Sequence, residues 1–116
     1  MELYTSKLRI IGVFALVELI MTYFVSTPDV SLVMRLLTAI GVMAVTLVIV
    51  DIFLGPGYRL VAVPVALAIS EVLINMYREY PTIPPLTIWQ KAIAAGLVGL
   101  VSVFIANLLP TTIIAI

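Results

Sequence analysis

The sequence predicts an all-α integral membrane protein, built as one transmembrane domain of four helices over residues 1–116. Of its 116 residues, 64% are hydrophobic and only 10% are charged, whereas soluble domains carry about 25% charged residues. A soluble chain of this length could not bury so much apolar surface. Four apolar segments approach the roughly 20 residues that cross a bilayer; they span residues 6–25, 28–54, 58–80 and 87–109. We therefore expect a compact four-helix bundle in lipid.

Turn-forming residues separate these segments. Thr27, Pro28 and Asp29 suit the cap and first turn of the second helix. The Gly-Pro-Gly stretch at 55–57 predicts a break before the third helix. Prolines at 81, 84 and 85 predict a second loop, and Thr-Ile-Trp-Gln at 87–90 is a capping-box pattern that opens the fourth helix. Pro64 is expected to kink the third helix, and Pro110 to end the fourth.

The composition excludes several function classes. The chain contains no histidine and no cysteine, so the usual haem ligands, zinc ligands, thiolate sites and disulfides are missing. We expect no metal and no cofactor. The formal net charge is zero, without a basic cluster, which argues against nucleic acid as a partner. No phosphate-binding loop or catalytic triad pattern is found, so we expect no enzyme.

Two carboxylates interrupt the apolar segments. Glu18 lies in the first segment and Glu71 in the third. A carboxylate near the bilayer centre costs roughly 2–3 kcal/mol on insertion scales, so it is usually paired, protonated or functional. Thr22 and Asn75 each follow one helical turn after a carboxylate and could hold its proton or share a cation. Two interpretations stay open: a proton- or cation-binding pair, or neutral or ion-paired acids that join helices.

The two halves of the chain align with each other. An offset of 53 residues places Glu18 on Glu71 and Pro28 on Pro81. With two further residues in the second loop, Gly41 falls on Gly96. This alignment favours two copies of one helical hairpin, although apolar sequences also align by chance. A true repeat would place both carboxylates on equivalent helices around a common seam.

Other charged residues have more ordinary interpretations. Arg35 either extends to the headgroups or pairs with a carboxylate. Asp51 is expected at the membrane interface, and Arg78, Glu79 and Lys91 are expected as solvated or headgroup charges. The six cations divide equally between the two predicted sides, so the positive-inside rule gives no orientation.

The fourth segment combines a small-residue face with one amide. Small side chains let helices approach closely in lipid, and those at helical spacing are Ala92, Ala95, Gly96 and Gly99. We interpret this face as a helix-packing surface, within the chain or between protomers. Asn107 is a candidate to bond across a helix interface or to support the ion site.

Short stretches resemble known membrane proteins. The length, the four spans and Glu18 in the first span resemble the small multidrug resistance transporters. In that family the carboxylate exchanges protons for cationic drugs within an antiparallel dimer, which implies this role for Glu18. The stretch 66–71 lacks that family's glycine pair, and its aromatic cage is also missing. The stretch 71–75, Glu-Val-Leu-Ile-Asn, is similar to the small three-span subunit of complex I and related antiporter-like complexes, as is Pro-Asp-Val at 28–30.

These observations lead to two functional hypotheses. The first is a non-catalytic accessory or structural subunit of a larger membrane assembly, with the lipid bilayer and other membrane subunits or copies of itself as partners. The alternative is a small homo-oligomeric transporter or channel, coupled to protons or cations through Glu18 and Glu71. In both cases we expect a multi-pass protein with both termini on the same side.

Overall fold

The computed structural model describes residues 6–108, and all regular structure in this range is helical, without strands. Four α-helices and one short 3₁₀ helix follow in chain order: α1 (Lys7–Met21), α2 (Leu32–Phe53), η1 (Pro56–Tyr58), α3 (Arg59–Tyr77) and α4 (Ile88–Leu108). The all-helical prediction with four main helices is therefore confirmed. The expected end of the fourth helix at Pro110 lies outside the described residues.

The helix ends follow local capping chemistry. Ser6 caps α1 by accepting from the backbone N–H of Leu8. The predicted box at the start of α4 is present: Gln90 N donates to Thr87 Oγ1 at 3.2 Å, and Thr87 N donates to Gln90 Oε1 at 2.9 Å. Gly55 has φ of 90°, a conformation that costs glycine little, and this explains the break after α2.

Two boundaries differ from the prediction. α1 ends at Met21 rather than near residue 25, and a turn closed by backbone bonds continues to Val25. α2 begins at Leu32, because Ser31 and not Thr27 caps it, accepting from Met34 N at 3.2 Å. Pro28 instead lies in a turn that the bond from Val30 N to Thr27 O closes. α3 continues as one helix through Pro64.

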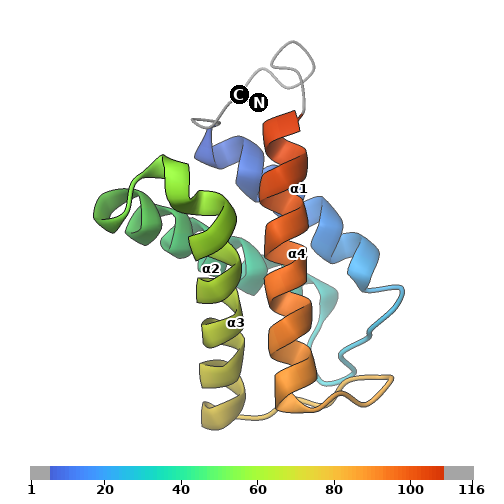
Figure 1. Cartoon of the computed structure of the whole chain (residues 1–116). Helices are drawn as coiled ribbons and strands as arrows, with labels where there is room; N and C mark the ends of the chain where they lie inside the picture. Colours follow the sequence, from blue (N-terminus) through green and yellow to red (C-terminus); the bar gives the residue numbers. More distant parts are fainter. Residues whose placement is uncertain (1–5, 109–116) are drawn as a thin grey trace.

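The four helices contact one another around a ring. α1 packs on α2, α2 on α3, α3 on α4, and α4 on α1, whereas the diagonal pairs lie apart. Figure 1 shows α3 and α4 side by side and α2 running across their direction behind them. The turns after α1 and after α3 meet at one end, where Ser26 and Ile83 form an isolated antiparallel bridge.

Three stretches are long and apolar enough to cross a membrane: Leu32–Phe53, Pro56–Tyr77 and Ile88–Leu108. α1 has 15 residues, or about 22 Å, which is shorter than the roughly 30 Å of a hydrocarbon core. The prediction of a long first helix is therefore not met by α1 alone.

The core lies among the helices toward the beginning of α1. Its fully buried members are Ile10, Met43, Leu47, Val63, Val103 and Ala106. The small face of α4 packs on α3: a Cβ added at Gly96 would lie 3.3 Å from Pro64 O, and one at Gly99 would meet the Leu67 side chain. Ala92 is buried as well. This face therefore serves a contact inside the chain.

Candidate functional site

A cavity of about 270 Å³ lies between the four helices. All four helices contribute to its wall, and the loops after α1 and after α3 line one end of it. Most of the wall is apolar, but four charged side chains reach it: Glu18, Arg35, Glu71 and Lys91. The two carboxylates singled out in the sequence therefore share one cavity, although their helices do not contact each other directly.

The first half of the site is an ion pair between α1 and α2. Arg35 Nε donates to Glu18 Oε1 at 2.9 Å, and Arg35 Nη1 donates to Val25 O at 2.7 Å. The two side chains are only 14% and 18% exposed. The Val25 carbonyl is available because the chain leaves α1 at Met21 and turns there. Arg35 thus joins α2 both to the carboxylate of α1 and to the turn that follows it.

The second half of the site is a network around Glu71. Asn75 Nδ2 donates to Glu71 Oε1 at 3.1 Å and to the Glu71 carbonyl at 2.8 Å, and the Tyr80 hydroxyl also donates to Glu71 Oε1. Lys91 Nζ donates to Asn75 Oδ1 at 2.9 Å and to Tyr80 O, and lies 4.3 Å from the centroid of the Tyr80 ring. Asn75 therefore bridges the carboxylate of α3 and the ammonium of α4.

The four charged groups balance. Two carboxylates face a guanidinium and an ammonium, so the formal charge of the cavity is zero. Each of the two hairpins places an acid on its first helix and a cation on its second helix, directly paired in one case and joined through Asn75 in the other. Such pairing offsets the cost of removing charges from water.

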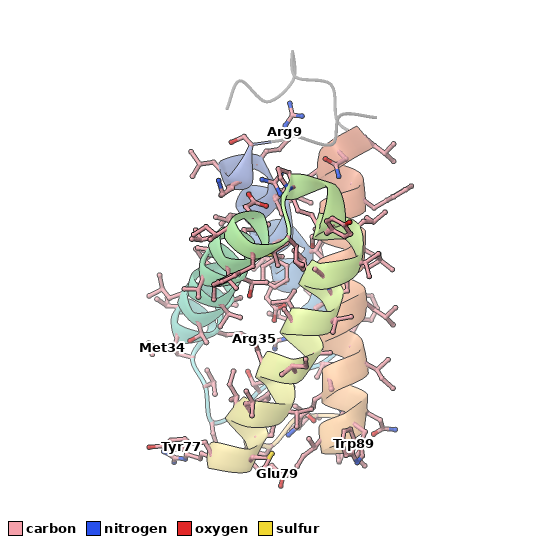
Figure 2. The ribbon with its side chains drawn as sticks, turned by 60° about the vertical axis from the view of Figure 1, so that its left-hand side comes forward. Arg9, Met34, Arg35, Tyr77, Glu79 and Trp89 are labelled. Atoms are coloured by element: carbon pink, nitrogen blue, oxygen red, sulfur yellow. The ribbon has the colours of Figure 1, made fainter. Side chains whose placement is uncertain are left out.

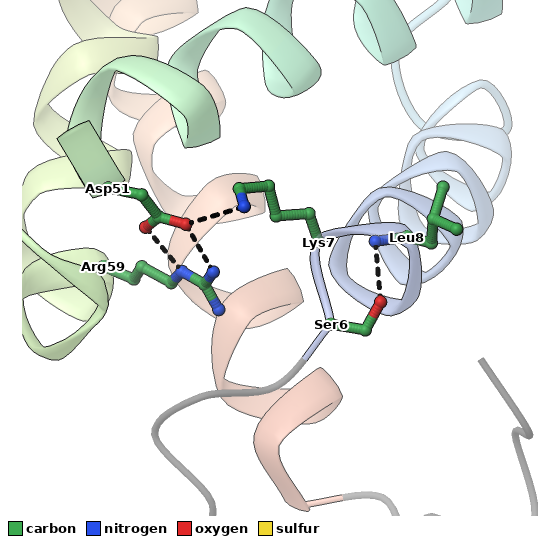
Figure 3. A network of polar contacts seen from close by, with 5 residues as sticks. All are labelled: Ser6, Lys7, Leu8, Asp51 and Arg59. Atoms are coloured by element: carbon green, nitrogen blue, oxygen red, sulfur yellow. Dashed lines mark hydrogen bonds and ion pairs between the residues drawn. The ribbon is translucent and has the colours of Figure 1, made fainter.

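A second polar cluster lies at the opposite end of the helices. Arg59 binds Asp51 through two hydrogen bonds, from Nε to Oδ1 at 2.9 Å and from Nη2 to Oδ2 at 2.6 Å (Figure 3). Lys7 Nζ lies 3.4 Å from Asp51 Oδ2, but its side chain is 47% exposed. This two-pronged geometry is typical of strong arginine–carboxylate pairs. The cluster fixes α2 to α3 across the Gly-Pro-Gly break.

An apolar layer separates the two polar regions on every helix. Ile10 lies between Lys7 and Glu18 in the chain, and Leu47 lies between Arg35 and Asp51. Val63 on α3 and Val103 on α4 occupy the corresponding stretches, and all four side chains are fully buried. Mostly apolar buried side chains therefore lie between the cavity and the second cluster, together with the buried hydroxyls of Thr46 and Ser102.

The other predicted site residues have mixed positions. Asn75 joins the network, but Thr22 donates to the Leu19 carbonyl at 2.6 Å and is not part of the cavity wall. Asn107 is buried sixteen residues beyond Lys91 on α4, about 24 Å along the helix. The structure therefore does not bring Asn107 together with Glu18 and Glu71. No group of three acidic, histidine or cysteine side chains suitable for a metal is found within residues 6–108.

Two residues of the site, Lys91 and Tyr80, were not predicted in these roles. Lys91 was expected among headgroups but is only 4% exposed, because Asn75 and Tyr80 hold its ammonium. Arg35 pairs with Glu18, which was one of the two roles predicted for it. Tyr80 was not singled out in the sequence. Asn75 lies two residues before the end of α3 and Lys91 three residues after the start of α4, and these similar distances from the connecting loop could have indicated their contact.

No protein-family model, curated protein or solved structure matches the chain. Its function is therefore inferred from the geometry described above.

Proposed function

We propose that the protein is a multi-pass integral membrane protein that serves as a non-catalytic accessory or structural subunit of a larger membrane assembly. The single observation that carries the membrane location is that charged side chains are buried while many apolar side chains are exposed, the inverse of the distribution in a soluble protein. Arg59 and Lys91 are only 4% exposed, whereas Leu16 is 63% and Val61 70% exposed. In water this arrangement would expose apolar surface and bury charge, both of which are unfavourable.

The ends of the helices support the same location. Figure 2 shows Tyr77, Glu79 and Trp89 together at one end and Arg9 at the other. Tyr77 and Trp89 are 92% and 70% exposed, as expected of aromatic residues at a membrane interface. Between the two ends, exposed leucine, isoleucine and valine side chains occur on all four helices. Such a surface suits the hydrocarbon of a bilayer.

The proposed topology has four crossings. α1 is short, but the turn that follows it extends the segment to Val25. The charge of Glu18 in the last turns of α1 is compensated by Arg35 of α2. α1 begins at the end of the molecule where α4 finishes (Figure 1), so both termini would be on one side. The matching acid–cation pairs of the two hairpins favour the internal repeat.

The accessory role is supported by the paired charges and by the mostly apolar interior between the two polar clusters. The intramembrane charges are compensated within the chain, and the buried side chains between the two ends are mostly apolar. A conducting pathway needs continuous polar groups or water across the membrane. A subunit that holds its charges in fixed pairs instead gains a defined helix arrangement, which a partner can recognise.

Purification of the tagged full chain from its native membranes in mild detergent tests this proposal. We expect extraction only with detergent, together with unrelated membrane subunits in fixed stoichiometry. A chain that is monodisperse in detergent-free buffer would contradict the membrane location. A chain that purifies alone and is active as an isolated monomer would contradict the accessory role.

A second candidate function is proton- or cation-coupled transport. The observation that favours it is that Glu18 and Glu71 line the same cavity. Reconstitution into liposomes with an imposed proton or cation gradient would test it. Transport would be supported if the unaltered protein shows coupled flux and the double variant Glu18→Gln and Glu71→Gln shows none. Glu79→Gln is the control and should show the same flux as the unaltered protein. Unchanged flux in the double variant would exclude this role for the carboxylates.

A further inference from the structure

We propose that the cavity between the helices binds a small zwitterion, a ligand that carries an ammonium and an anionic group a few atoms apart. This inference rests on the proposed membrane location but not on the accessory role. It assigns a ligand class to the cavity, in addition to the contacts that its residues form with one another.

The size and wall of the cavity suit such a ligand. Its volume of about 270 Å³ lies just below the roughly 300–1,000 Å³ of pockets for drug-sized molecules. Its wall is mostly apolar, with few polar groups that converge from different helices. This combination is typical of small-molecule sites, in which apolar contacts supply affinity and the polar groups fix orientation.

Both carboxylates retain acceptor capacity. Glu18 and Glu71 accept their hydrogen bonds through Oε1, and within residues 6–108 no bond to either Oε2 is found. An ionised carboxylate has about four acceptor positions. A ligand ammonium, with three N–H donors, would therefore find unused carboxylate acceptors in the cavity wall without displacing an existing contact.

The Arg35 guanidinium supplies the complementary group. It has five N–H donors, of which the bonds to Glu18 and Val25 use one each from Nε and Nη1. Its side chain is 14% exposed and lies in the cavity wall. An anionic group of the ligand would therefore find donors beside the carboxylates that hold its ammonium.

The balance of charge decides between a zwitterion and a simple ion. Glu18, Glu71, Arg35 and Lys91 already sum to zero. An added cation or anion would leave one uncompensated charge in a region of low dielectric constant, which is costly. A zwitterion leaves the sum at zero while it satisfies donors and acceptors of both signs.

The position of the cavity leaves two sources for this chemistry. One end of the wall is formed by loop residues, including Thr27 and Thr82, and exposed aromatic residues mark the same end of the helices. A headgroup of a zwitterionic phospholipid could reach this depth, and so could a free zwitterion from the aqueous side. Both present an ammonium and an anion to the same side chains.

Thermal unfolding of the full chain in detergent micelles tests the inference. Dioleoylphosphatidylethanolamine is expected to raise the unfolding temperature by several degrees, and equimolar dioleoylphosphatidylglycerol, which lacks the ammonium, is not. If free glycerophosphoethanolamine, the same phosphodiester headgroup without acyl chains, reproduces the increase, the ligand is a solute; if only the phospholipid does, it is a headgroup. Equal effects of both lipids, or no effect of any of the three probes, would overturn the inference.

Matched variants locate the binding. Glu18→Gln and Glu71→Gln should each weaken binding at least about ten-fold, whereas Glu79→Gln, which alters an exposed carboxylate outside the cavity wall, should leave it unchanged. Undiminished binding in the first two variants would place the zwitterion elsewhere and overturn the assignment. If these variants do not fold, the comparison of lipids on the unaltered chain still decides. A chain that needs no detergent would instead contradict the membrane location.

Discussion

At the scale of single residues, the two arginine–carboxylate pairs carry the sharpest consequences. Each joins α2 to a neighbouring helix, Glu18–Arg35 to α1 and Asp51–Arg59 to α3. Removing one partner of a buried pair leaves the other charge uncompensated, which costs about 3–5 kcal/mol, whereas replacing both is often much milder. The pairs therefore define helix contacts more than they add stability.

The first prediction concerns Arg35. Arg35→Met should lower the free energy of unfolding by about 3–5 kcal/mol, because Glu18 would be left with an uncompensated charge. Adding Glu18→Gln to this variant should restore a large part of the loss. Denaturant unfolding in micelles, followed by circular dichroism, measures both. A double variant that is less stable than Arg35→Met would contradict the pairing.

The second prediction compares the two cations at Asp51. Asp51→Asn should cost about 3 kcal/mol, because the Arg59 side chain is only 5% exposed. Lys7→Gln should cost less than about 1 kcal/mol, because the half-exposed Lys7 forms a largely solvated contact. The same unfolding measurement applies. Equal losses in the two variants would show that burial does not set the strength of these contacts.

At the residue scale, the sequence drew attention to the two acids but not to the burial of Lys91. A carboxylate inside an apolar segment is conspicuous, so Glu18 and Glu71 were identified, and both line the cavity. A lysine near a helix start is ordinary, and nothing local distinguishes a headgroup lysine from the buried Lys91. The difference arises from Asn75 and Tyr80, which the fold brings to Lys91 from α3 and the following loop.

At the scale of elements, the closest helix contact is between α3 and α4. Gly96 and Gly99 allow it, because a Cβ at either position would approach Pro64 or Leu67 of α3. Close approach through small residues is a common basis of helix association in lipid. The sequence predicted this face but left open whether it packs inside the chain.

The third prediction uses two glycines as a pair. Gly96→Leu should destabilise the protein by about 1–3 kcal/mol, because the added side chain forces α4 away from the Pro64 backbone. Gly41→Leu on α2 is the matched control, since a Cβ there would meet nothing within 4 Å. It should be neutral or slightly stabilising, because leucine favours helix more than glycine does. Thermal unfolding in micelles separates the two, and similar losses would contradict the packing.

The helices themselves were largely predictable, whereas their boundaries were less so. The Gly-Pro-Gly break and the Thr87–Gln90 box act locally, and both are found where the sequence placed them. The start of α2 was misplaced because two adjacent segments offered capping residues, and Ser31 rather than Thr27 caps the helix. The direction of α2, which runs across α3 and α4 (Figure 1), depends on contacts between helices, and no local sequence pattern specifies these contacts.

At the scale of the whole molecule, the inverted distribution of charge and apolar surface dominates. Buried arginine and lysine together with exposed leucine and valine fit the apolar surroundings of the proposed membrane location. The same distribution predicts two ends of the molecule that face opposite sides of a membrane.

The fourth prediction follows from the absence of cysteine, which makes single-cysteine variants simple to label. Ser6→Cys and Gly57→Cys should react with a membrane-impermeant maleimide from one side of oriented vesicles. Asp29→Cys and Glu79→Cys, in the loops at the other end, should react only from the opposite side. Labelling of Ser6→Cys and Asp29→Cys from the same side would show that α1 does not cross.

Each of the two acids in the cavity wall has its cation in the same hairpin, which has a consequence for biosynthesis. Only 17 residues separate Glu18 from Arg35, and Lys91 follows Glu71 within the next hairpin. As the ribosome releases the chain, the neutralising residue of each acid emerges almost at once, before the following hairpin exists. Each acid of the cavity can thus meet its cation as soon as its own hairpin is complete, whereas Asp51 meets Arg59 only when the second hairpin begins.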